Sequence, residues 1–521
     1  MSSERTPLIY REGPWPARRR LLVAATMLTS FLAMLDLTIV ATCVPTIASE
    51  FDAFDRESWI GTSYLWSNVT FTPLYARLSD AIGRRTAYLQ AVSLFTLETL
   101  GCGLAPSFTG LTVARFVAGM GGGGASAVAS IVLSESFPPE DRGFYQGLGF
   151  AVFGAGIGLG GPIGGWLTQA WGWRAAFYAQ IPVAVACIVL ARLTIPQDQE
   201  RRYSADTLAE IDLAGSATLL LSIGALLHVL QRSSAVIPLR HDITGLIALV
   251  ASVTFFAAFM VIELRLTRRP VLPLTLLRQR TALSVGIIAG VIAIVNFNML
   301  YHLPMVFEIV FDESLSRAGA HVLPNSAAMT LSAPIMGYLV KRTRRYKWLT
   351  VTCCAGPVVA MALLSGLGPE SGAAVRWLAV APMGAGFSGL LTLTLIGMLN
   401  SVPKSQIAVA TGFVFVFRSL GQVFGVGMSG AVFQASLAAE LGKRFSDPKV
   451  RHSCLWLTPQ LIDALRRASK TIKRLPAPGR ALAVAAYGAA LRNTFLFGLA
   501  GAVVVFVASL CIPDLEIIDD R

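Results

Sequence analysis

The chain has 521 residues, of which 54% are hydrophobic and only 14% charged, and its mean hydropathy is +0.62. These values exclude an ordinary soluble globular protein and predict one with many membrane spans. A helix needs roughly 20 residues to cross about 30 Å of hydrocarbon, so a dozen or more spans fit. The net charge of +13 does not indicate a nucleic-acid partner, because the basic residues lie in alternate short loops beside a lipid bilayer.

The hydrophobic segments predict an all-α membrane protein with about fourteen transmembrane helices. An even number of spans puts both termini on one side, and the basic loops place that side in the cytoplasm. The first segment is too long for a signal peptide and lacks a cleavage site. The predicted spans are 21–47, 58–78, 86–105, 109–133, 145–169, 174–194, 211–230, 243–263, 283–305, 317–340, 348–368, 374–398, 408–433 and 491–512.

Asp36 lies in the middle of the first segment. An ionised carboxylate at a membrane helix centre costs roughly 2.5 to 3.5 kcal/mol to insert, so it usually faces a wet cavity and handles a proton or cation. The alternatives are a structural partner of an arginine, or an error in helix placement. Arg115 in the fourth segment is the natural partner by depth, since the two residues lie roughly 16 and 9 Å below the outer edge.

A carboxylate and a guanidinium at this depth would make a proton switch. The nearby cation favours the charged form of Asp36, and its departure favours uptake of a proton. For Arg115 alone, the alternative is a helix-packing cation whose donors bond to carbonyl groups.

Other kinds of site are not predicted. The seven cysteines show no metal-ligand spacing and imply no disulfide framework. Gly156-x-Gly158-x-x-Gly161 matches a dinucleotide fingerprint as a string, but it lies within a membrane helix instead of a strand-turn-helix unit. We therefore expect no cofactor, no metal and no enzymatic activity.

Motifs in order along the chain carry a family resemblance. The second segment ends in Ala76-Arg77-Leu78-Ser79-Asp80-Ala81-Ile82-Gly83-Arg84-Arg85, the fourth carries Arg115 with Gly119, and the fifth holds Gly161-Pro162-Ile163-Gly164-Gly165. With Leu35-Asp36-x-Thr38-Ile39-Val40 they resemble the major facilitator superfamily, and fourteen spans make the chain similar to its drug:proton antiporter branch. Ser58 to Tyr64 and Trp173 to Phe177 are most similar to fungal vacuolar basic amino acid transporters.

The resemblance implies two six-helix bundles, 21–194 and 283–512, with two helices inserted in the segment 195–282. The tails 1–20 and 513–521 would be cytoplasmic, and the long loop 434–491 would not. An internal repeat agrees with a duplicated bundle, since Gly337-x-Leu339 followed by Lys341 echoes Ala76-x-Leu78 followed by Asp80.

The resemblance also suggests roles for two motifs. A gating loop would stabilise one conformer of the transport cycle, although Arg84 and Arg85 could simply anchor the topology. In the fifth segment, glycines would let neighbouring backbones approach, and proline would bend the helix. The gating residues are Asp80, Gly83, Arg84, Arg85 and Arg142. The packing motif is Gly161, Pro162, Gly164 and Gly165, and we expect close backbone packing at Gly154, Gly156, Gly158 and Gly160 as well.

The ninth segment would line the cavity by analogy with the first. Its candidate cargo contacts are Asn296, Asn298, His302 and Glu308. The alternatives are a solvated mouth residue for Glu308 and a packing histidine for His302. Arg418 in the thirteenth segment is predicted to be a packing or gating cation.

Three functions remain open at this point: proton-coupled transport of cationic amino acids into the vacuole, export of drugs, toxins or siderophores at the plasma membrane, and a transceptor that has lost transport. The cargo would be a small cation, exchanged for protons. Glu4 with Leu8 and Ile9 resembles an acidic dileucine signal, which a sorting adaptor would bind for delivery to the vacuole.

Overall fold

The structure is a computed structural model that describes residues 17–53, 58–196, 212–233, 242–267, 274–368, 370–403, 407–445, 465, 472 and 475–512. These residues form helices and short connections, with no strand among them. The first half contains α1 (Ala17–Glu50), α2 (Ser58–Ile82), α3 (Arg84–Leu104), α4 (Phe108–Glu135), α5 (Pro139–Trp171), α6 (Trp173–Tyr178) and α7 (Ile181–Thr194). The inserted helices are α9 (Leu213–Ser233) and α10 (Ile243–Val261), which ends in a π-helical turn, Ile262–Leu266.

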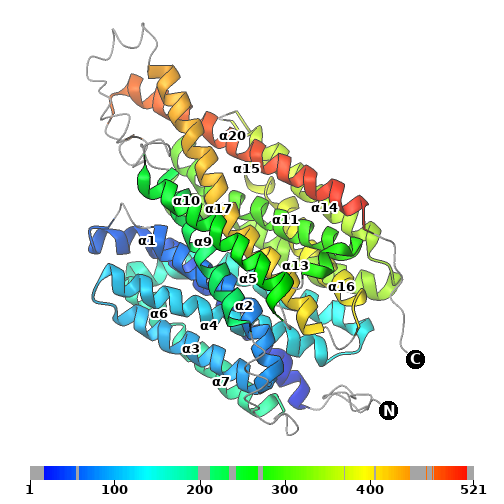
Figure 1. The fold of residues 1–521 in the computed structure, drawn as a ribbon. Helices are drawn as coiled ribbons and strands as arrows, with labels where there is room; N and C mark the ends of the chain where they lie inside the picture. The colour runs from blue at the N-terminus through cyan, green and yellow to red at the C-terminus, as the bar shows by residue number, and fades with distance from the viewer. Residues whose placement is uncertain are drawn as a thin grey trace, which may run out of the picture.

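The second half begins with a short 3-10 helix, Leu274–Arg278, before α11 (Arg280–Met305) and the π-helical turn Val306–Val310. It continues with α12 (Leu315–Ala320), α13 (Leu323–Thr343), α14 (Lys347–Ser365), α15 (Ala373–Leu378), α16 (Ala381–Asn400), α17 (Ile407–Phe445) and α20 (Ala477–Leu510). The start of α1 and the end of α20 lie at the same end of the bundle (Figure 1).

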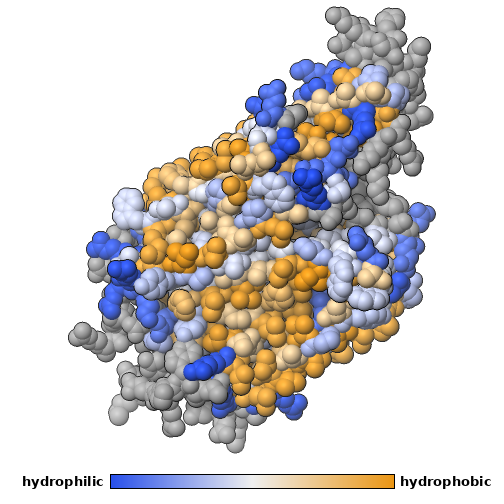
Figure 2. Space-filling view, turned by 180° about the vertical axis from the view of Figure 1, so that it is seen from behind, coloured by the Kyte–Doolittle hydropathy of each residue, from blue (hydrophilic) through white to orange (hydrophobic). Residues whose placement is uncertain are grey.

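The predicted class, an all-α membrane protein, is confirmed. Ten helices in the described part of the chain are long and apolar enough to cross a membrane. Figure 2 shows a broad hydrophobic surface with hydrophilic residues gathered towards its ends. On the inserted helix α10, large side chains such as Ile247, Val253 and Phe256 are exposed. Because this exposed surface is apolar along the helices, we assign it to lipid contact.

The helices that contain the last two predicted spans are longer than those spans. α17 continues past residue 433 to Phe445, and α20 begins at Ala477 instead of residue 491. The mean hydropathy of α17 falls where polar residues begin. The helix nevertheless continues, because Ala438, Ala439, Glu440 and Leu441 are good helix formers. Pro478 in the first turn of α20 is likewise compatible with a helix start. The connection predicted for 434–491 is thus partly helical, and residues 446–464 lie outside the described part.

The two halves repeat the same packing. In the first half, α1 packs on α5 and α7, α2 on α4, and α3 on α4 and α7. The second half repeats these contacts with α11 on α17 and α20, α13 on α16, and α14 on α16 and α20. The halves meet through α5 with α13 and through α2 with α17, so the second helix of each half contacts the fifth of the other. The repeated contacts agree with a duplicated helical bundle.

The inserted helices pair with each other and contact both halves. Ser222 and Ser252 each donate a side-chain hydrogen bond to the other's carbonyl oxygen, both at 3.0 Å. Trp66 Nε1 of α2 donates to the Leu220 carbonyl oxygen at 2.8 Å. α9 also packs on α17. Figure 1 shows α9 and α10 in green across the junction between the halves.

Glycines on α5 form two separate packing faces. Gly156, Gly160 and Gly164 face α1; an added Cβ at Gly156 would lie 2.7 Å from the Phe31 carbonyl oxygen, and one at Gly164 would lie 3.1 Å from Ile39 Cα. Gly147, Gly154 and Gly158 face α13, where the first would meet the Ala333 carbonyl oxygen at 2.5 Å. One face holds the first bundle together, and the other joins the two halves.

The glycines expected to pack closely do not all do so. Gly164 lies against α1, but a Cβ at Gly161 would make an ordinary contact at 3.8 Å, and one at Gly165 would meet nothing within 4 Å. Pro162 lies within the helix. On each face the closely packed glycines are spaced four or seven apart, because residues i, i+4 and i+7 share a helix face.

We expect Gly160→Ala to lower the stability of the protein, and Gly165→Ala to leave it unchanged or raise it slightly. A methyl group at residue 160 would collide with Thr38 and approach the Leu35 carbonyl oxygen to 3.0 Å, and overpacking costs about 1–3 kcal/mol. Thermal unfolding in detergent compares the two variants. Equal loss of stability in both variants would show that the loss does not depend on the contact between Gly160 and α1.

Candidate functional site

A buried ion pair joins α1 to α4 inside the first half. Arg115 Nη1 donates to both carboxylate oxygens of Asp36, at 3.0 and 2.7 Å. Both side chains are 1% exposed. Arg115 Nε also donates to the Ile60 carbonyl oxygen at 3.4 Å, and its guanidinium lies 4.5 Å from the centre of the Tyr64 ring. The structure thus brings together the two residues that helix depth had paired.

The pair is incompletely bonded. Arg115 Nη2 is buried and makes no hydrogen bond to any described residue. A buried ion pair stabilises a protein only weakly, whereas losing one partner costs about 3–5 kcal/mol because a charge is left uncompensated. Separating the two groups therefore requires a new partner for Arg115 and a proton or cation for Asp36.

Arg84 is the centre of a second charged cluster, at the end of the bundle where α1 begins. It pairs with Asp80 at 2.8 Å and with Glu135 at 2.6 Å, and its Nη1 donates to Ser79 Oγ at 2.6 Å. Gly83 precedes α3 with φ of +89°, which strains any L side chain, so glycine allows the abrupt turn from α2 into α3. The sequence motif contained four of these residues but not Glu135, the last residue of α4.

The other gating candidates make separate contacts. Arg85 Nη2 donates to the Arg192 carbonyl oxygen at 2.8 Å, and Arg142 Nε donates to the Phe137 carbonyl oxygen at 3.0 Å. Next to Arg142 on α5, Asp141 pairs with Lys341 of α13 at 2.6 Å. This last pair connects the two halves, and no motif in the sequence indicates it.

At the opposite end of the bundle, each of the following hydrogen bonds and ion pairs joins residues of the same half. Glu50 accepts hydrogen bonds from Trp173 Nε1 at 2.6 Å and Arg174 Nη1 at 2.7 Å, and these bonds hold the pKa of Glu50 below its usual value. In the second half, Arg480 pairs with Asp312 at 2.9 Å. The ion pair between Asp141 and Lys341 must break when the halves separate at the end of the bundle where α1 begins. The contacts of Glu50 and Arg480 lie within one half each, so they can persist when the halves separate at the opposite end.

The candidates on α11 lie mostly inside the second half. Asn298 Nδ2 donates to the Thr494 carbonyl oxygen of α20 at 2.8 Å, and His302 Nδ1 lies 2.9 Å from the Asn298 carbonyl oxygen. Asn296 is fully buried, and neither amide atom bonds to a described residue. Glu308 is half-buried in the π-helical turn. In this conformation, Asn298 and His302 therefore serve helix packing instead of lining a space between the halves.

Tyr301, which the sequence analysis missed, points towards the other half. Its hydroxyl lies against Gly61 of α2, 3.7 Å from the position of an added Cβ. Gly61 follows Ile60, whose carbonyl oxygen accepts a hydrogen bond from Arg115. The sequence contains a hint of this position, because Tyr301 is a polar aromatic residue in a membrane helix and directly precedes the candidate residue His302.

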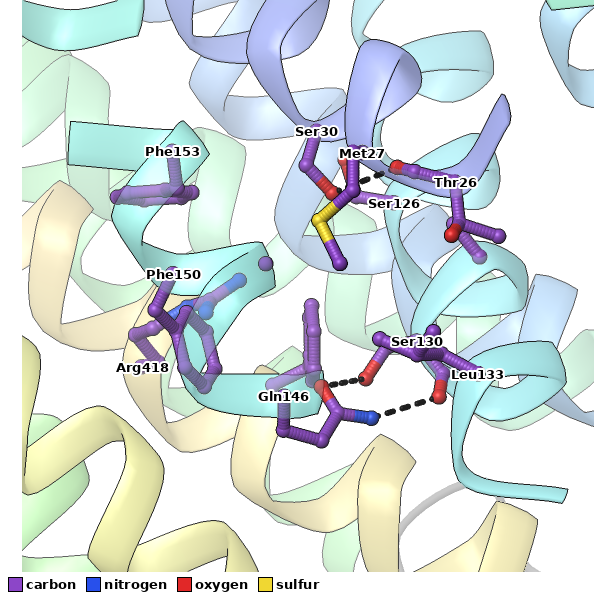
Figure 3. Close-up of a pocket in the computed structure, with 13 residues that line it drawn as sticks. Thr26, Met27, Ser30, Ser126, Ser130, Leu133, Gln146, Phe150, Phe153 and Arg418 are labelled. Carbon is purple, nitrogen blue, oxygen red and sulfur yellow. Dashed lines mark hydrogen bonds between the residues drawn. The ribbon is translucent and has the colours of Figure 1, made fainter. Parts of the chain in front are cut away.

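A small cavity lies between α1, α4, α5 and α17, with Thr26, Ser30, Ser130, Gln146 and Arg418 among its polar lining residues (Figure 3). Its volume is about 30 Å³, which is enough for ordered water. An amino acid does not fit in that volume, so this cavity must widen before it can hold cargo.

The sequence matches the Major Facilitator Superfamily over residues 26–426. The chain belongs to this family and is a multi-pass membrane transporter of small molecules. It is 32% identical to multidrug resistance protein fnx1 of Schizosaccharomyces pombe, over 95% of this chain and 93% of that protein. It is 29% identical to vacuolar basic amino acid transporter 1 of Saccharomyces cerevisiae, over 80% and 78%.

A solved structure also shares the fold. The human organic anion transporter MFSD10 aligns with a TM-score of 0.58 at 14% identity, over 94% of this chain and all of that one. The proposed sorting residues Glu4, Leu8 and Ile9 lie outside the described residues.

Proposed function

We propose that this protein is a proton-coupled transporter that moves basic amino acids into the vacuole by alternating access. The observation that most supports this proposal is the ion pair between Asp36 and Arg115, whose side chains are both 1% exposed inside a membrane bundle. Ionisable groups at such depth are expensive and are usually kept for handling protons, ions or charged cargo. The similarity to a vacuolar basic amino acid transporter supports this choice of cargo.

The mechanism couples the charge of Asp36 to the position of Arg115. A proton on Asp36 removes its negative charge, and the attraction that holds Arg115 is lost with it. A cationic cargo group competes for the same carboxylate, so the proton and the cargo exclude each other. Cargo is exchanged for protons if Asp36 takes up a proton when it is open to the acidic lumen and binds cargo when it is open to the cytoplasm.

The halves would move about the α5–α13 and α2–α17 contacts. If α1 begins in the cytoplasm, the ion pair of Asp141 with Lys341 closes the cytoplasmic side in this conformation. Its side chains are 31% and 49% exposed, and an exposed ion pair contributes only about 0–1 kcal/mol. Such a weak contact biases the equilibrium between conformers without locking either one.

The test is uptake of radiolabelled lysine by sealed vacuolar vesicles that contain the protein, compared with vesicles from cells that lack it. We expect accumulation that requires an acidic lumen and collapses when a protonophore is added. Lysine flux that is unaffected by the protonophore would contradict the coupling.

Export of drugs is the second candidate, because the chain aligns over 95% of its length with a multidrug resistance protein. The same vesicles decide between the two. Proton-driven movement of hydrophobic cations without lysine flux would favour the exporter. Microscopy of a Leu8→Ala, Ile9→Ala double variant tests the location, since loss of the sorting signal should move the protein away from the vacuole.

A further inference from the structure

Arg418 is a buried cation on α17, at the junction of the two halves. Its side chain reaches three phenylalanine rings: its guanidinium carbon lies 4.0 Å from the centre of the Phe415 ring, 5.4 Å from that of Phe153 and 6.0 Å from that of Phe150. The last two rings belong to α5 of the other half. Figure 3 shows Arg418 with these α5 rings on one side of the cavity, and Thr26, Ser130 and Leu133 on the other.

Arg418 has no anionic partner among the described residues. The residue is 6% exposed, its Nε atom is fully buried, and that atom makes no hydrogen bond. Arg115 is also buried, but Asp36 neutralises it. Contacts with aromatic rings return about 0.5–2 kcal/mol each, whereas burying an unpaired charge costs several kcal/mol. The three rings offset part of this cost, but a ring face does not replace a hydrogen-bond acceptor, and the buried Nε–H has none among the described residues.

The rest of the cavity wall is neutral and polar. Thr26 and Ser30 come from α1, Ser130 from α4 and Gln146 from α5. Gln146 Nε2 donates to the Ser130 carbonyl oxygen at 2.9 Å and to Ser134 Oγ at 2.7 Å, so its side chain is fixed. Arg418 is the one charged residue among those that line this described cavity. The hydroxyl groups of Thr26, Ser30 and Ser130 already donate to acceptors within the first half. Arg418 is therefore the donor that this cavity offers to an anion, and a carboxylate matches the planar donors of arginine best.

We propose that Arg418 binds the carboxylate group of the transported molecule when the halves separate and the cavity widens. This rests on the proposed function, under which the anion is the α-carboxylate of lysine, arginine or histidine. Ser30 at the cavity and Asp36 lie six residues apart on α1, about 9 Å along the helix. That rise is comparable with the length of an extended lysine. Under this proposal Arg418 binds the carboxylate, and Asp36 receives the cationic end once Arg115 has left it.

A comparison of lysine with its decarboxylated analogue cadaverine tests the carboxylate-binding end of the site apart from the cation-binding end. In vesicles with the wild-type protein, unlabelled lysine should compete with labelled lysine far better than cadaverine or lysinamide does. In Arg418→Gln, the concentration of lysine needed for half-maximal uptake should rise about 10- to 100-fold, as for loss of a hydrogen bond to a charged group. Competition by cadaverine should not change, and Arg418→Lys should be intermediate.

Arg444→Gln is the matched control, because Arg444 lies on the same helix but pairs with Glu440 away from the cavity. It should behave as wild type. The unfolding midpoint of each variant is measured in detergent, and if Arg418→Gln does not fold, the analogue series on the wild-type protein decides alone.

The outcomes are distinct. Equal competition by lysine and cadaverine in the wild type overturns the carboxylate site but leaves cation transport intact. Equal loss of lysine and cadaverine competition in a folded Arg418→Gln protein assigns Arg418 to packing and also overturns the site. Uptake of neither compound by the wild-type protein overturns both this proposal and the proposed function.

Discussion

Asp36→Asn is expected to abolish proton-driven accumulation of cargo in sealed vesicles, to the level of vesicles without the protein. The carboxylate is the one acidic group in contact with Arg115 among the described residues, and it lies at mid-depth of α1 with 1% of its side chain exposed. An amide of the same shape cannot carry a proton from one side to the other. The measurement is labelled lysine uptake at several imposed pH gradients.

Glu50→Gln is a matched control on the same helix, since Glu50 lies at the end of α1 with 43% of its side chain exposed. It should transport as wild type does. Counterflow, in which labelled lysine enters in exchange for unlabelled lysine without a gradient, should persist in part in Asp36→Asn if the cavity still opens. Full pH-driven accumulation by Asp36→Asn would remove Asp36 from the coupling step.

The Asp36–Arg115 contact could be predicted from the sequence because both residues stand alone in long apolar helices. The constant rise per residue gives their depth, and a buried charge needs a partner at a similar depth. The contact of Arg84 with Glu135 could not be found in this way. Both residues lie at helix ends, where water makes unpaired charge inexpensive, so nothing in the sequence forces a particular pair.

The glycine faces of α5 show a second limit. The sequence displays many glycines in one helix, but it does not state which neighbouring helix each one faces. Gly160 faces α1 and Gly158 faces α13, although they are two residues apart. The same limit applies to Asn298 and His302, because rotation of α11 about its axis is set by packing with α17 and α20.

Arg115→Gln is expected to destabilise the protein more than the Asp36→Asn, Arg115→Gln double substitution does. Removing Arg115 leaves a buried carboxylate without its cation, at a cost of about 3–5 kcal/mol, whereas the double variant buries two neutral amides of similar shape. The double variant should recover most of the thermal stability but none of the proton-driven transport. A double-mutant cycle of unfolding midpoints in detergent, with both single variants, measures the coupling between the two residues.

Asp36→Asn by itself should lie between these variants in stability. It leaves Arg115 charged, but Arg115 keeps its bond to the Ile60 carbonyl oxygen and its contact with the Tyr64 ring. If the losses of stability in the two single variants simply add in the double variant, the two charges do not depend on each other. The release of Arg115 on protonation would then fail as the coupling step, even if Asp36 carries the proton. Recovery of stability without recovery of transport would instead separate the structural role of the pair from its role in moving protons.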